Sequence, residues 1–169
     1  MRPSALPAIA AACCLGLSAA QAAPACPEMP VFNIEALKSE MMVLATACHD
    51  DSQYNAFIER FHPELLANEH RLDEYFKRVY GRRGQAEHDS FITSLANAQS
   101  DEGLKQGTDF CPRNATLFEE AMVVTSPELP SFAAGKDVLP ATLGGCQEET
   151  PAPSRAVVHH VVRKTTKHE

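Results

Sequence analysis

The sequence lacks the short motifs on which common hydrolases, phosphotransferases and metalloenzymes depend. It has no GxSxG elbow, no SxxK, no HExxH, no glycine-rich phosphate loop and no CxxCH for covalent haem. Carboxylates such as Asp73 and Glu74 are adjacent in sequence, so on a helix they would point in different directions instead of forming an acid/base pair. The sequence therefore favours a protein that is not an enzyme and that uses no cofactor.

Long apolar runs are also scarce, and the one that stands out lies at the start of the chain, over residues 5–17. Arg2 precedes this run and a small-x-small pattern follows it at residues 20–22, which is typical of a secretory signal peptide. The run is too short for a permanent membrane anchor. We predict cleavage near Ala22 and a mature protein, without a transmembrane segment, in the bacterial periplasm or outside the cell. The alternatives are a buried N-terminal helix and a lipoprotein acylated at Cys13 or Cys14.

Cysteine is uncommon, but the cysteines beyond the leader agree with export. These are Cys26, Cys48, Cys111 and Cys146, and an even number of cysteines in a small exported chain indicates disulfides. Four cysteines allow three pairings, of which we favour Cys48–Cys111 inside the helical core and Cys26–Cys146 across the ends. No CxxC motif is present, which argues against a redox site or a zinc knuckle. A metal site using all four thiolates, or a reactive Cys111 at a helix start, are the alternatives.

The most strongly patterned stretch covers residues 57–81. After Pro63, apolar side chains recur at helical spacing while polar residues, including Asn68, occupy the other face, and Gly81 follows the last turn. We expect further helices over residues 33–49, 51–61 and 85–99 and from about residue 112, with a loop over residues 101–108. His88 lies between two acidic residues and is expected to be exposed. The sequence thus predicts an all-α fold, a small disulfide-stabilised bundle of four to five helices.

The remaining segments differ from this core in composition. We predict an extended lead-in over residues 23–32, the helical domain over residues 33–124, an irregular segment packing on the domain over residues 125–146, and a disordered basic tail over residues 147–169. The formal net charge of the chain is −7, although its tail is basic. An acidic core does not favour a nucleic-acid partner.

Histidine is the residue type most worth testing for chemistry. Glu59 and His62 have the i, i+3 spacing used in di-iron helical bundles, but such bundles need this motif twice and two further inward glutamates. Three histidines of the tail, His159, His160 and His168, are candidates for weak metal binding. We predict no metal site, and we keep a small exported enzyme or metal-binding protein that uses these residues as the alternative function.

The run LKSEMMVLATACHDDSQYNAFIERFHPELLANEHRLDEYFKRVYG, with the later FITSLAN and the pair Phe110-Cys111, resembles a group of small exported helical proteins of alphaproteobacteria that are mostly labelled uncharacterised. The resemblance covers about residues 34–122. It implies an all-helical periplasmic domain in which Cys48 and Cys111 are natural partners. It implies no catalytic residues.

The predicted function is that of an exported, non-enzymatic helical protein that binds a protein or a small-molecule partner. Protection of other proteins under acid stress is one form of this function, by analogy of size and compartment with periplasmic acid-stress chaperones. Another form is a carrier with a closed pocket lined by Phe57, Phe61, Phe76 and Phe91, although such phenylalanines more simply build a core.

Overall fold

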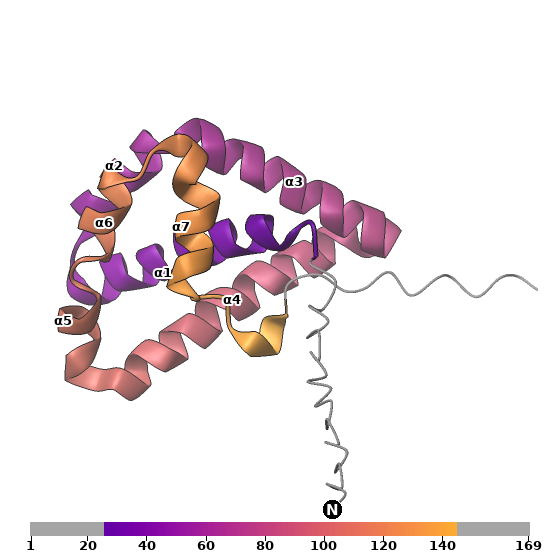
Figure 1. Cartoon of the computed structure of the whole chain (residues 1–169). Helices are drawn as coiled ribbons and strands as arrows, with labels where there is room; N and C mark the ends of the chain where they lie inside the picture. Colours follow the sequence, from indigo (N-terminus) through magenta and orange to yellow (C-terminus); the bar gives the residue numbers. More distant parts are fainter. Residues whose placement is uncertain (1–25, 145–169) are drawn as a thin grey trace, which may run out of the picture.

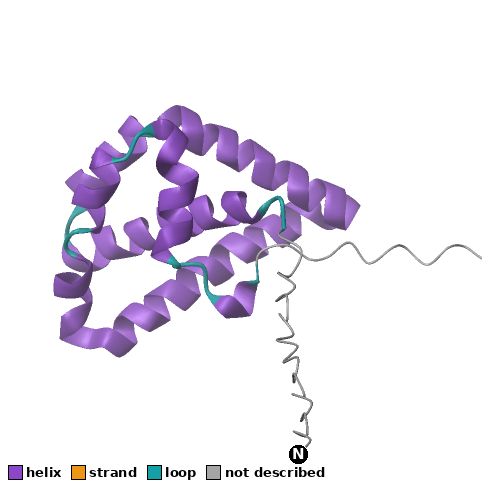
Figure 2. Cartoon of the chain, viewed as in Figure 1, coloured by secondary structure: helices purple, strands orange, loops and turns teal. Residues whose placement is uncertain are grey.

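The computed structural model describes residues 26–144, and the regular structure in this range is helical (Figure 1). Figure 2 shows the helices joined by short connections, and no strand occurs within residues 26–144. The longer helices are α1 Met29–Cys48, α2 Asp51–Arg60, α3 His62–Tyr80 and α4 Gly84–Gln106. The shorter helices are α5 Phe110–Asn114, α6 Leu117–Val123 and α7 Leu129–Lys136. The predicted all-α bundle is confirmed. The predicted leader and tail, residues 1–22 and 147–169, lie outside the described range.

Helix α1 is the central element of the domain. Figure 1 shows it crossing the middle of the molecule, with α7 lying across it and α3 and α4 meeting near its beginning. Its apolar side chains enter two separate cores. Those that pack with α2, α3, α5, α6 and α7 are Ile34, Leu37, Met41, Leu44 and Ala45. Those that pack with α3 and α4 are Val31, Phe32 and Ala36. None of the described helices combines the length and the apolar character that crossing a bilayer requires.

A disulfide between Cys48 and Cys111 joins the end of α1 to α5, across a sequence separation of 63 residues and with Cα atoms 5.7 Å apart. This pairing confirms the first of the two predicted disulfides. Loop-closure arguments give roughly 4 kcal/mol of stabilisation for a crosslink over such a separation, through the lost entropy of the unfolded chain. The second pairing, Cys26–Cys146, stays a prediction because Cys146 lies outside the described residues.

Three prolines of the described residues lie in the first turn of a longer helix or of α7. Pro63 lies in the first turn of α3, which confirms the predicted break after α2. Pro30 likewise lies in the first turn of α1, so the predicted extended lead-in is wrong from Met29 onward. Pro130 lies in the first turn of α7, and the segment over residues 125–146, predicted to be irregular, therefore contains a helix that packs on α1. The physical reason is that a first-turn residue donates no intrahelical hydrogen bond, so proline is tolerated there.

The predicted loop over residues 101–108 is also wrong, because α4 continues to Gln106. Gly103 is buried in this last part of α4, and a Cβ at this position would lie 3.2 Å from the Phe110 ring. The glycine therefore allows an aromatic ring to pack closely on the helix instead of ending it. The single helix expected from about residue 112 is divided into α5 and α6.

The turn between α3 and α4 brings the two backbones into close contact. Gly81 ends α3 with a φ of +57°, and the 3-10 turn η1, Gly81–Arg83, leads directly into α4. A Cβ at Gly84 would lie 2.9 Å from the Phe76 carbonyl oxygen and 2.9 Å from the Lys77 Cα. Because both of these atoms belong to backbone, an added side chain would force the helices apart.

We therefore expect Gly84→Ala to lower the free energy of unfolding by about 2 kcal/mol or more, through backbone displacement at this turn. Gly135→Ala in α7 is the matched control, because a Cβ at Gly135 would meet no atom within 4 Å. The control should leave stability unchanged or raise it by about 0.5–1 kcal/mol. Denaturant unfolding of both variants with the disulfide intact measures the difference. Equal stability of Gly84→Ala and the unsubstituted protein would contradict the close approach.

Candidate functional site

The candidate metal ligands Glu59 and His62 are not joined by further possible ligands within the described residues. Glu59 lies near the end of α2, His62 is the first residue of α3, and both side chains are exposed. Within residues 26–144, no three His, Cys, Asp or Glu side chains are grouped so that they could hold a metal ion. The other candidates, His159, His160 and His168, lie outside the described residues. The described domain therefore adds no further ligands to Glu59 and His62.

A charged network that was not predicted joins α1, α3 and α4. Lys38 Nζ lies 2.8 Å from Glu35 Oε1 and 3.1 Å from Glu69 Oε2, and only 3% of the Glu35 side chain is exposed. His88 Nε2 lies 3.6 Å from Glu69 Oε1, and its Nδ1 lies 3.3 Å from Asp73 Oδ1. His88 is buried, so the expectation that it is exposed is wrong. Helical spacing places His88 on the same face of α4 as the buried residues that follow it. This spacing predicts its burial better than its acidic sequence neighbours do.

Two buried amides attach the neighbouring helices to the backbone of α1. Asn68 Nδ2 donates to the Val31 carbonyl oxygen at 3.1 Å, and Gln99 Nε2 donates to the Ala36 carbonyl oxygen at 2.9 Å. Asn68 was expected on the polar face of α3, but only 1% of it is exposed. That expectation failed because a carbonyl on another helix accepts a hydrogen bond from the amide nitrogen, which sequence spacing alone does not reveal.

The charged network has the electrostatics of a site but lines neither of the two surface clefts described below. Burial raises the pKa of Glu35, and the adjacent Lys38 ammonium opposes this rise. A perturbed carboxyl in a cleft would be a catalytic candidate. However, neither of the two surface clefts described below is lined by Glu35, Lys38 or the other members of the network. We therefore interpret the network as a structural connection between α1, α3 and α4.

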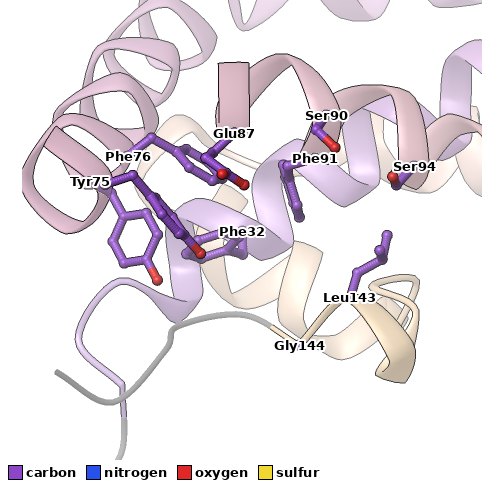
Figure 3. Close-up of a pocket in the computed structure, with 10 residues that line it drawn as sticks. Phe32, Tyr75, Phe76, Glu87, Ser90, Phe91, Ser94, Leu143 and Gly144 are labelled. Atoms are coloured by element: carbon purple, nitrogen blue, oxygen red, sulfur yellow. The ribbon is translucent and has the colours of Figure 1, made fainter. Parts of the chain in front are cut away.

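The candidate site is an aromatic cleft at the end of the domain where α3 turns into α4. It has a volume of about 180 Å³. Its aromatic lining consists of Phe32, Tyr75, Phe76, Tyr80 and Phe91. Its polar lining consists of Glu87, Ser90 and Ser94, which recur along one face of α4. Figure 3 shows Leu143 opposite this face, on the 3-10 turn η4, Ala141–Leu143, with its side chain directed toward α4.

The rings of the aromatic cleft form a fixed wall. Phe32 packs edge-to-face on Tyr75, with centroids 5.0 Å apart, and on Phe91, with centroids 5.3 Å apart. Phe76 stacks on Tyr80 at 5.7 Å and also contacts the His88 ring at 5.4 Å. Because each ring is held by another ring, the wall is formed before any ligand arrives.

The polar edge of the cleft is accessible to solvent. One third of the Glu87 side chain is exposed, at 33%, and its Oε1 lies 2.9 Å from Arg83 Nη1. Ser90 is exposed and Ser94 is half-buried. The arrangement can contact an apolar group with the rings and a polar or charged group with the edge.

The predicted pocket of four phenylalanines is divided between two places. Phe76 and Phe91 line the aromatic cleft. Phe57 and Phe61 are fully buried in the other core, where they pack on each other with centroids 5.3 Å apart. Sequence spacing identified the apolar faces, but it did not distinguish a ring beside a cleft from a ring inside a core.

A second cleft, of about 360 Å³, lies between α1, α3 and the start of α7. Its lining includes Pro63, Pro127 and Pro130, and its carboxylate, Glu64, has a pKa lowered by a hydrogen bond from Ser126. Since no aromatic ring lines this second cleft, the aromatic cleft is the stronger candidate.

The ionisable groups of α1 predict how stability depends on pH. Burial, together with the nearby Glu102 carboxylate, raises the pKa of Glu40 from 4.5 to about 7. The folded state therefore gains stability from Glu40 at low pH, and this gain is lost as the pH rises through about 7. We expect Glu40→Gln to raise the free energy of unfolding by about 1–2 kcal/mol near pH 8, allowing for solvent screening, and by almost nothing near pH 4.

Denaturant unfolding at both pH values tests this expectation. Glu102→Gln is the control, because it removes only the smaller cause of the Glu40 shift and should give a smaller change in the same direction. A stability difference for Glu40→Gln that does not vary with pH would contradict the assignment.

Comparison of the chain with protein-family models, with curated proteins and with solved structures finds no match. The resemblance to exported alphaproteobacterial proteins thus stays a prediction, and the aromatic cleft is interpreted from its own geometry.

Proposed function

We propose that this chain is an exported, non-enzymatic helical protein that binds a small molecule in the aromatic cleft. The observation that supports this function is the meeting of five rings with a polar edge in one surface cleft. Ligand sites are commonly mostly apolar, with a few polar groups that fix orientation. Because the ring wall is already packed, binding would require little ordering of side chains.

The size of the cleft limits the ligand. A volume of about 180 Å³ is below the roughly 300–1,000 Å³ of sites for drug-sized ligands. The occupant is therefore a small molecule, or the head group of a larger one whose remainder stays in solvent.

The proposed location outside the cytoplasm follows from the sequence pattern of the leader and from cysteine chemistry. Disulfides persist in oxidising compartments, and the Cys48–Cys111 bond agrees with such a compartment. Reducing conditions would remove this crosslink between α1 and α5.

The geometry favours ligand binding over the two alternatives. For a stress-protective protein opened by acid, the ionisable groups act in opposite directions: the raised pKa values of Glu35 and Glu40 favour the folded state at low pH, whereas the lowered pKa of Glu64 disfavours it. They therefore give this alternative no specific support. A metal-dependent enzyme built on Glu59 and His62 would need further ligands, which the described residues do not bring to them.

Amide NMR titration of the mature protein tests the proposed function. The probes are choline and 3,3-dimethylbutan-1-ol, two small molecules of the same shape. We expect at least one of them to shift the amides of Ser90, Ser94 and Gly144, which line the cleft. Ser94→Phe should abolish the shifts because its ring would fill the cleft.

Thr93→Phe is the matched control, since it places the same ring on the exposed neighbouring position of α4 and should leave binding intact. Thermal unfolding of both variants confirms that they are folded. The absence of cleft shifts with both probes would contradict ligand binding at this site.

A further inference from the structure

We propose that the aromatic cleft selects a small organic cation, with an ammonium or methylated ammonium head group held by the ring faces and by Glu87. This inference rests on the proposed function and names the chemical class of its ligand. It depends on three features of the cleft: the rings, the carboxylate and the contacts that the chain's own cations already make beside them.

The rings provide the first feature. An aromatic face carries negative electrostatic potential, so a cation near the ring centre is attracted to it, most strongly where water is excluded. Phe32, Phe76 and Phe91 are at most 9% exposed, so they form the packed floor of the cleft and little of each ring is open to solvent. A neutral ligand of the same shape would gain the apolar contact but not this electrostatic attraction.

Glu87 provides the second feature. It lies on the same face of α4 as Ser90, Phe91 and Ser94, and a carboxylate at the polar edge completes the combination that recognises ammonium groups. The same carboxylate would repel an anion, and the formal charge of −7 acts in the same direction. The serine hydroxyls alone would suit a neutral ligand or an anion, but Glu87 opposes the anion.

Two arginines of the chain already make cation–ring contacts with tyrosines that line the cleft. The Arg78 guanidinium lies 5.5 Å from the Tyr75 ring centroid, and the Arg83 guanidinium lies 6.0 Å from the Tyr80 ring centroid. Arg83 also pairs with Glu87, so one cation contacts both a ring and the carboxylate of the cleft. Arg83 is 73% exposed, and exposed ion pairs contribute little, so a ligand cation competes with it at low cost.

The two probes isolate the contribution of charge. Choline carries a quaternary nitrogen where 3,3-dimethylbutan-1-ol carries a carbon, and the two are otherwise closely matched in shape. We expect choline to bind about five- to thirtyfold more tightly at low ionic strength, which corresponds to one or two favourable cation–ring and carboxylate contacts. Raising the salt concentration should reduce this difference because Glu87 is partly exposed.

Two substitutions locate the selectivity. Glu87→Gln should weaken choline binding about threefold or more and leave the neutral alcohol unchanged. Arg83→Ala should strengthen choline binding, because it removes the competing cation. Arg82→Ala is the matched control: it removes the same charge from the neighbouring exposed residue of η1, and its effect should be smaller.

The outcomes separate this inference from the proposed function. Equal binding of both probes, or tighter binding of the alcohol, would overturn cation selection while leaving a small-molecule site. Choline binding that survives Ser94→Phe, or that is indifferent to Glu87→Gln, would overturn the assignment of the cation to this cleft. Failure of both probes to bind would overturn the proposed function and the cation inference with it.

Discussion

Burial of the first three turns of α1, residues 31–41, is the constraint on which the rest of the domain depends. One set of its side chains enters the core shared with α2, α5, α6 and α7, and another enters the core shared with α3 and α4. No position within residues 31–41 is exposed, so polar residues in this part of α1 are buried or half-buried with the apolar ones. Glu35 is therefore compensated by Lys38, and the amides of Asn68 and Gln99 donate to α1 carbonyls. The neighbouring helices are thus held by specific polar contacts as well as by apolar packing.

The same constraint explains how much of the fold could be predicted. Helix class follows from local periodicity, whereas the even number of cysteines indicates disulfides but leaves three pairings open. The all-α class and the favoured Cys48–Cys111 pairing are both confirmed. The strongest periodicity belongs to α3, because a helix with one exposed face separates apolar from polar residues clearly. Where α1 is buried, apolar and polar residues are not separated onto two faces, so its sequence does not show that it is the central helix. The prediction was correct at Pro63 but wrong at Pro30 and Pro130, which also begin helices, because only tertiary packing decides whether a helix follows a proline.

The candidate site was less predictable because its parts come from four segments. Tyr80 follows Phe76 on α3 and Glu87 precedes Phe91 on α4, each at helical spacing, but the two pairs are brought together by the close backbone contact at Gly84. Nothing in sequence spacing indicates that contact. By contrast, the spacing of Glu59 and His62 is conspicuous in the sequence, yet no other helix brings ligands to it within the described residues. A short motif shows only that its residues share one face of one helix or turn, whereas a binding site requires residues from several helices to lie close together.

Cleft and core are connected through Phe76. One side of this ring lines the aromatic cleft, and His88 contacts it at 5.4 Å from the direction of the charged network. The carboxylates of Glu69 and Asp73 lie 3.6 and 3.3 Å from the ring nitrogens of His88, and Lys38 connects Glu69 to α1. The wall of the cleft is therefore fixed by interactions that no ligand has to supply, and only Glu87 and the serines remain adjustable at its edge. Since ordering a binding site lowers affinity, a wall fixed in this way favours even a small ligand whose contacts are few.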